Sequence, residues 1–159
     1  MAEGELSVFR PGDELRKKLD AKTPKKYIEK HPYSGLDYVM VGYVRRRLSE
    51  AFGLGWSYTT DIVTPWDFIA KTKQLAVKVR LEIRGKDGQA LIVKENFGSS
   101  EVKCYKSDHK TRPNEPMDIG NDLKAALADG LKKCASMLGI CADVFEPKVE
   151  AKEAAVAEP

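Results

Sequence analysis

The strictest alternation of apolar and polar residues in the chain lies between residues 72 and 84. Five apolar residues occupy every second position there: Leu75, Val77, Val79, Leu81 and Ile83. Such alternation is typical of a strand with one buried face and one exposed face. Weaker alternation at 56–63 and 90–97, with the turn-forming residues 85–88 between the last two strands, predicts an antiparallel sheet with one long hairpin.

Three other segments are predicted to be helices. The first covers 11–18 and has a proline and two acids in its first turn and bases at its end. The other two carry apolar residues at steps of three and four. The second covers 39–52, and its apolar stripe consists of Val41, Val44, Leu48, Ala51 and Phe52. The third, at 118–138, is the longest, with a stripe of Ile119, Leu123, Ala126, Leu127, Leu131, Cys134 and Leu138. A short strand is expected at 27–29 and a turn at 31–37.

The order of these segments predicts an α+β fold. Its core is β-β-β-α: a three-stranded antiparallel sheet with a long hairpin, packed against helices that include the long C-terminal one. We expect one folded domain over residues 11–145, with irregular residues 1–10 before it and a disordered acidic tail at 146–159 after it. The polar stretch 98–116 is expected to be a mobile loop. Because a small open sheet has two unpaired edges, a second copy of the chain can add to it.

Charge and composition narrow the classes of protein. The formal net charge is +3 at pH 7. The last fourteen residues hold four Glu and two Lys, so the rest of the chain carries +5. A basic body is compatible with a polyanionic partner, and it is also common in proteins that bind none. There is no apolar run long enough to span a membrane and no secretory signal, and three Cys suggest free thiols, so we expect an intracellular, cytoplasmic protein.

Nothing in the sequence marks a catalytic or metal site. The two histidines, His31 and His109, lie in turn-rich segments, and the usual nucleotide-binding and hydrolase motifs are absent. Cys104 and His109 are close in sequence, but their spacing matches no paired zinc ligands. We therefore expect no enzyme, no cofactor and no metal.

Basic and aromatic residues give a more specific hypothesis. Lys78 and Arg80 line the polar face of the long hairpin, and Lys132 and Lys133 lie off the apolar stripe of the last helix. Arg45–Arg47 lie mostly off the stripe of their own helix, which also fits an ordinary solvated face. These cations together can track a phosphate backbone, with stacking surfaces among Tyr33, Tyr38, Tyr43, Trp66 and Phe68. The alternatives are core packing for the aromatic residues and a surface ion pair of Lys133 with Asp129, one helical turn earlier.

Several short motifs occur in a definite order along the chain. The first half of the chain has Tyr27-Ile28, Tyr38-Val39, a helix ending Glu50-Ala51-Phe52-Gly53, and Gly55-Trp56-Ser57. A hairpin with Asp87-Gly88 follows, then Gly98-Ser99-Ser100, then Asp129-Gly130-Leu131-Lys132-Lys133 and Leu138-Gly139. In this order and spacing the motifs resemble the Rad fifty-two family of single-strand annealing proteins. The resemblance covers about residues 11–145, and the short length is similar to that of bacterial and phage members.

The resemblance implies an oligomeric ring that holds single-stranded DNA in an outer groove, with phosphates inside and bases facing out. It implies that Lys132 and Lys133 contact phosphate, and less firmly that Lys30, His31 and Tyr38 line the groove. The candidate DNA-binding set is therefore Lys132, Lys133, Lys30, His31, Tyr38, Arg46, Arg47, Lys78 and Arg80. Two departures reduce the basic charge: Ser136 stands where the family often has a third base, and His31 where it usually has Arg.

The function implied by the resemblance is annealing of complementary single strands in recombination and double-strand break repair. The partners are single-stranded DNA and further copies of the chain, and a single-strand-binding protein or a nuclease is a candidate third partner. The alternative is a general RNA- or DNA-binding module without annealing activity.

Overall fold

The structure is a computed structural model that describes residues 11–146. The predicted irregular N-terminus, residues 1–10, lies outside the described residues, and so does the predicted acidic tail apart from Glu146. The helices are α1 (Asp13–Asp20), α2 (Val41–Phe52), α3 (Trp66–Thr72), α4 (Ile119–Ser136) and α5 (Ala142–Phe145). A short 3-10 turn covers Lys25–Tyr27. The strands are β1 (Ile28–Lys30), β2 (Asp37–Val39), β3 (Trp56–Ile62), β4 (Gln74–Arg84) and β5 (Ala90–Glu101).

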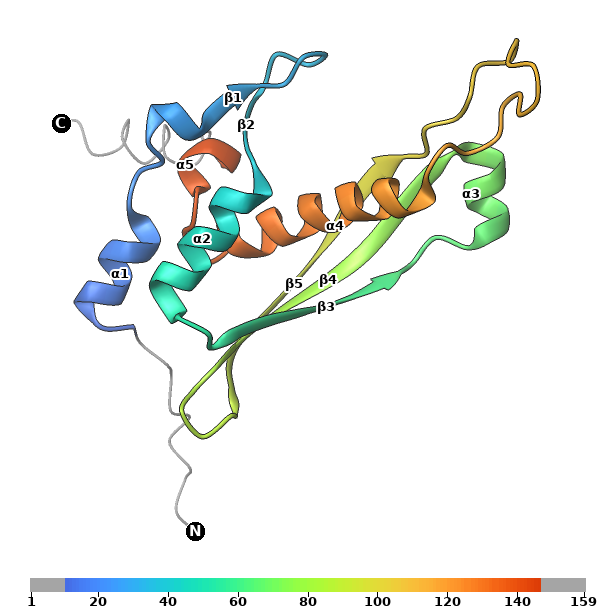
Figure 1. The fold of residues 1–159 in the computed structure, drawn as a ribbon. Coiled ribbons are helices and arrows are strands. Elements are labelled where there is room, and N and C mark those ends of the chain that lie inside the picture. Colours follow the sequence, from blue (N-terminus) through green and yellow to red (C-terminus); the bar gives the residue numbers. More distant parts are fainter. Residues whose placement is uncertain (1–10, 147–159) are drawn as a thin grey trace, which may run out of the picture.

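An extended arm made of a three-stranded sheet and α4 dominates the molecule (Figure 1). The sheet has the antiparallel order β3-β4-β5, as predicted. The alternating residues of β4 are buried against α4: Leu75, Val77, Val79, Leu81 and Ile83. From α4, Ala126, Leu131 and Cys134 complete this core without measurable exposure. The α+β architecture and the β-β-β-α core are therefore confirmed.

Two glycines let α4 approach the sheet closely. A Cβ atom on Gly98 of β5 would lie 1.9 Å from the carbonyl oxygen of Ala126 and 2.4 Å from the backbone nitrogen of Gly130. A Cβ atom on Gly130 of α4 would lie 2.6 Å from Cγ2 of Val79. Real Cβ atoms do not approach other atoms so closely, so helix and strand touch here through their backbones. Hydrogen bonds hold the same crossing: Asp129 accepts from the Ser99 amide at 3.0 Å, and Ser100 donates to the Asp122 carbonyl at 2.7 Å.

A second group of elements lies at one end of the arm. Helices α1, α2 and α5 gather around the C-terminal half of α4, and the β1–β2 hairpin projects from them (Figure 1). The two strands of this hairpin pair antiparallel, with Glu29 opposite Tyr38. Val39, Val44, Leu48 and Ile140 bury their side chains where these elements meet α4.

Several sequence expectations need correction. Residues 98–101 are not part of a loop, because they continue β5 and pair with residues 74–77 of β4. The helix predicted from residue 39 begins at Val41, since Val39 pairs with Ile28. Strand β2 and the short helices α3 and α5 were not predicted, because three to seven residues are too few to show a period. The two ends of the remaining predicted loop are hydrogen-bonded to each other. Cys104 and Pro116 form an isolated antiparallel β-bridge, and the Tyr105 amide donates to the Glu115 carbonyl at 2.9 Å.

Membrane-spanning helices are not found among residues 11–146, since none of their helices is both long enough and apolar enough to cross a bilayer.

Replacing Gly98 tests the backbone contact between α4 and β5. We expect Gly98→Ala to lower the free energy of unfolding by about 1–3 kcal/mol or more, because the new methyl group meets a helix backbone that cannot move aside. Gly42→Ala is the matched control: nothing lies within 4 Å of a Cβ there, and an alanine in an exposed helix is worth up to about 1 kcal/mol. Urea unfolding at one fixed protein concentration measures both. Equal stability of the two variants would contradict the contact.

Candidate nucleic-acid interface

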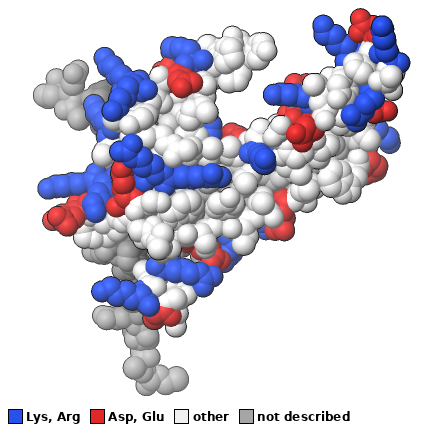
Figure 2. All heavy atoms as spheres, viewed as in Figure 1, with Lys and Arg blue, Asp and Glu red and all other residues white. Residues whose placement is uncertain are grey.

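The surface is hollowed between the overhanging β1–β2 hairpin and the arm (Figure 2). We call this hollow the notch, and define it by the hairpin, residues 28–39, on one side and the C-terminal half of α4 on the other. Figure 2 shows Lys and Arg side chains around the hairpin root and along the neighbouring surface. The notch therefore lies between two parts of the predicted site, the hairpin that carries Tyr38 and the half of α4 that carries Lys132.

Lys132 lies beside Tyr38 across the notch. Its Nζ atom is 5.6 Å from the centroid of the Tyr38 ring, within the range of a cation–π contact. The flanking residues of α4, Leu131 and Cys134, are buried against the sheet, and this turns Lys132 sideways toward the hairpin. Burial lowers the pKa of Lys132, whereas the nearby Asp129 carboxylate acts in the opposite direction. A phosphate at this position would favour the charged ammonium group and so oppose this lowering of the pKa.

Tyr38 is held by the strand facing it. Its hydroxyl donates to Oε2 of Glu29 at 2.7 Å, and the two residues are direct partners in the β1–β2 register. This hydrogen bond, together with burial and the Glu29 charge, raises the pKa of Tyr38, so the phenol stays protonated. The ring is thereby fixed with one face toward Lys132. The sequence did not indicate the role of Glu29, because the pairing of β1 with β2 was not predicted.

Lys30 and His31 follow on the same hairpin. Lys30 forms an ion pair with Asp37 at 2.6 Å, again between register partners. The ring of His31 lies edge-on to Tyr38, with 6.0 Å between centroids. The structure thus brings together four of the predicted residues, Lys30, His31, Tyr38 and Lys132, from two elements far apart in the sequence.

Lys133 lies one residue further round α4, on the side of β5. Its Nζ atom is 3.0 Å from Oδ2 of Asp129, so the surface ion pair expected from the spacing is confirmed. The same carboxylate oxygen accepts the amide of Ser99. Asp129 therefore orients Lys133 relative to the strand.

The lysines of the notch remain available to an anion although carboxylates accompany them. The side chains of Lys30 and Lys133 are 72% and 48% exposed, and ion pairs with this exposure stabilise a protein by less than about 1 kcal/mol. Exchanging a carboxylate for a phosphate at these positions therefore costs little. A nucleic-acid strand would gain free energy from each exchange, because counterions bound to its phosphates are released.

Lys78 and Arg80 are not brought into the notch. They occupy the positions of β4 that alternate with its buried residues, so their side chains lie on the sheet face opposite α4. Arg80 is also engaged there by Glu82 at 2.9 Å and Glu95 at 3.0 Å. Within one protomer the sheet and helix cations do not form the single channel that we expected, because the sheet separates them.

The two arginines predicted on α2 differ from each other. Arg46 is exposed, and it contacts Glu50 at 2.9 Å and the Tyr27 hydroxyl at 3.2 Å. Arg47 is only 5% exposed, so the expectation that it lies on a solvated face is wrong. It stands three residues after Val44, and this spacing was the available signal that it shares the buried face of α2.

Arg47 closes the end of α1. Its Nη2 atom donates to the carbonyl oxygens of Lys18, Leu19 and Ala21 at 2.8, 3.3 and 3.1 Å. Carbonyl groups at the end of a helix have no partners within the helix, and they carry partial negative charge. The guanidinium group satisfies them, so Arg47 holds α1 against α2 and is not free to meet DNA.

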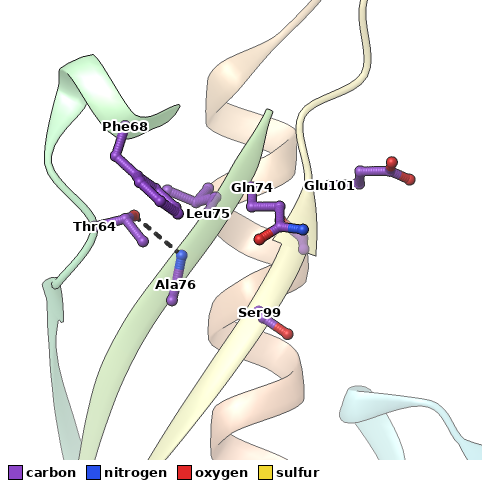
Figure 3. A pocket seen from close by; sticks show the side chains of 8 residues that line it. Thr64, Phe68, Gln74, Leu75, Ala76, Ser99 and Glu101 are labelled. Carbon is purple, nitrogen blue, oxygen red and sulfur yellow. Dashed lines mark hydrogen bonds between the residues drawn. The ribbon is translucent and has the colours of Figure 1, made fainter. Parts of the chain in front are cut away.

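Other aromatic residues lie outside the notch. Tyr43 stacks on Tyr27 with 4.1 Å between the ring centroids, so for Tyr43 the alternative of packing within the protein holds. Trp66 and Phe68 are exposed on α3, at the far end of the arm. Phe68 borders a hollow of about 420 Å³ between α3, β4 and β5 (Figure 3). Its eight lining residues include one carboxylate, Glu101, and no lysine or arginine, so this hollow does not suit a phosphate backbone.

The segment 103–116 forms a cluster of its own. The guanidinium of Arg112 lies 4.9 Å from the centroid of the Tyr105 ring, and His109 lies 4.5 Å from it. Nδ1 of His109 accepts the amide of Arg112 at 3.0 Å. In the part of the chain that the structure describes, no three His, Cys, Asp or Glu side chains gather closely enough to hold a metal ion.

Comparisons with known proteins add one finding. The family model described as Rad52/22 family double-strand break repair protein matches residues 12–157, which is most of the chain. No curated protein matches the chain.

Substitution of Arg47 distinguishes its structural role from a role in binding. We expect Arg47→Ala to destabilise the protein by about 2–4 kcal/mol, because three carbonyl groups at the end of α1 lose a buried, charged donor. Arg45→Ala, a change of the same kind at an exposed neighbouring position, should alter stability by less than about 0.5 kcal/mol. Thermal and urea unfolding measure both. If the two variants unfold together, Arg47 does not have this role.

Proposed function

Because this chain belongs to the Rad52/22 family of double-strand break repair proteins, we propose that it binds single-stranded DNA and promotes the annealing of complementary strands as an oligomeric ring. A role in recombination and repair follows from the family. Strand binding, annealing and the ring are the parts that we add, and each needs its own support and test.

The observation that carries the proposal is the position of Lys132 beside Tyr38 in the notch. A cation next to an aromatic ring, in a hollow open to solvent, is the combination that binds a single strand without regard to sequence. Lys30, His31 and Lys133 extend this group along the hairpin and the helix. The proposed contact residues are therefore these five, while Lys78, Arg80 and Arg46 belong to the remaining surface and Arg47 to the fold.

The proposed mechanism needs no bond to be made or broken. Lysines neutralise phosphates and release counterions, which makes binding strong at low salt and tolerant of sequence. A strand held by its backbone keeps its bases free to meet a complement. Annealing is then faster because one strand is already extended, so the mechanism requires neither a catalytic residue nor a nucleotide cofactor.

Two features of the protomer support assembly. β3 and β5 are the outer strands of the sheet, and among residues 11–146 nothing pairs with their outer edges. The sheet face opposite α4 carries Phe97, which is 57% exposed, next to the ion-paired Arg80 and Glu95. A ring would repeat the notch around its circumference, so weak contacts to each protomer would sum along the strand.

Removing the two lysines of α4 tests the proposed site. We expect Lys132→Ala with Lys133→Ala to weaken single-strand binding at least about tenfold at low salt. The slope of log affinity against log salt should fall by about 0.7 for each phosphate that the variant no longer neutralises. The annealing rate of complementary oligonucleotides should fall in parallel, and filter binding and strand annealing measure the two effects.

The matched control removes an adjacent lysine pair from another helix, Lys17→Ala with Lys18→Ala on α1. It makes the same change in net charge away from the notch, so we expect near-normal binding. Equal reductions in affinity in both double variants would contradict the assigned site. Normal binding by the wild type without any acceleration of annealing would favour the general nucleic-acid-binding module.

Assembly is tested separately by light scattering. We expect a solution mass of many times the 17.7 kDa protomer, because the exposed Phe97 face and the two sheet edges left unpaired by the described part of the chain favour self-association. A strict monomer at micromolar concentration would contradict the ring.

A further inference from the structure

The tip of the β1–β2 hairpin is an uncharged lobe that overhangs the notch. It consists of residues 32–36, among which Tyr33 is 95% exposed and Leu36 is 69% exposed. Figure 2 shows this lobe in white, with charged atoms at its root. A large aromatic ring so fully exposed, at the rim of a proposed binding site, suggests a contact with a partner.

Hydrogen bonds hold the tip in one conformation. The amide of His31 donates to the Leu36 carbonyl at 2.8 Å, and the amide of Gly35 donates to the His31 carbonyl at 2.9 Å. Nδ1 of His31 accepts the amides of Tyr33 and Ser34 at 3.4 and 3.3 Å. Gly35 has φ +67°, a conformation that glycine adopts without strain. The backbone that carries Tyr33 is therefore ordered before any ligand binds, which reduces the entropic cost of contact.

The exposed ring is connected to the lysine of the notch by a series of rings. Tyr33 lies 5.9 Å from His31, and His31 lies 6.0 Å from Tyr38, measured between ring centroids. Tyr38 in turn contacts the ammonium group of Lys132 at 5.6 Å. A path of aromatic surface thus leads from the cation inside the notch to the outer rim.

We propose that Tyr33 is a base-stacking site. A nucleotide whose phosphate lies near Lys132 continues into neighbours that pass the hairpin tip, and one of their bases stacks on the exposed Tyr33 ring. This inference rests on the proposed function, since it assigns a contact to the same single strand. Stacking on an aromatic ring tolerates every base, so it adds affinity without sequence preference.

The chemistry of the tip favours a base over a second protein copy. A protein interface at this position would have to bury Leu36 and Tyr33 together, whereas a base needs only the ring. The continuous path of rings to Lys132 suits a nucleic-acid strand, because phosphates and bases both repeat along such a strand. Contact with another protomer is the competing outcome, and the solution mass of a Tyr33 variant separates the two.

The test uses the full chain and a short oligonucleotide that contains 2-aminopurine, whose fluorescence is quenched by stacking. Wild type should quench the probe on binding. Tyr33→Ala should abolish this quenching and bind about tenfold more weakly, as expected when one base no longer stacks. Tyr33→Phe should behave as wild type, and Leu36→Ala, an apolar truncation in the same tip, should retain both quenching and affinity.

A second strand separates stacking from backbone binding. On an abasic strand, which keeps the phosphates and lacks the bases, wild type and Tyr33→Ala should bind equally, whereas the Lys132→Ala, Lys133→Ala variant should still be weaker than wild type. Unchanged affinity of Tyr33→Ala for the base-containing strand would overturn the stacking site and leave the proposed function intact. A smaller assembly in light scattering of Tyr33→Ala would assign the tip to a protomer contact and overturn the inference. Failure of the wild type to bind any strand would overturn the proposed function as well.

Discussion

The backbone contact between Gly98 and Gly130 determines how the rest of the molecule is arranged. It lets α4 lie directly on β5, at a distance that any side chain at either position would prevent. Because Gly130 and Leu131 face the sheet, the next residue, Lys132, is turned sideways to the β1–β2 hairpin, and Lys133 continues round the helix toward Ser99. The orientation of the two lysines is therefore a consequence of helix–strand packing.

The site also needs the β1–β2 hairpin to be held beside α4, and this depends on the buried guanidinium group of Arg47. Arg47 binds three carbonyl groups at the end of α1 and joins that helix to α2, while Val39 of β2 anchors the hairpin in the same core. The molecule thus separates two uses of positive charge. Arg47 is buried and committed to the backbone, whereas Lys30 and Lys133 are exposed and held only by weak ion pairs that a phosphate can replace.

The sheet divides the molecule into two faces with different chemistry. Along β4 the face toward α4 is apolar and buried. The opposite face carries the ion-paired Arg80, Glu82 and Glu95, together with Lys78 and the exposed ring of Phe97. Mutually paired charges around an apolar centre are suited to a protein contact, and the lysine–aromatic group of the notch is suited to an anion. This division is consistent with a protomer that assembles through the sheet and binds its strand at the notch.

Sequence alone determined the elements whose patterns are long. The alternation at Leu75–Ile83 and the stripe from Ile119 to Leu138 specified the sheet, the long helix and the α+β class, because burial of one face imposes a period that many residues share. The order and spacing of several short motifs, ending in Lys132-Lys133, indicated the family. Only the tertiary structure decided which cations meet. It placed Lys78 and Arg80 behind the sheet, buried Arg47, and joined Tyr38 to Lys132, contacts that depend on elements of three residues and on side-chain directions at a helix crossing. Short strands and crossings leave no period in the sequence, since their geometry is set by packing between segments far apart along the chain.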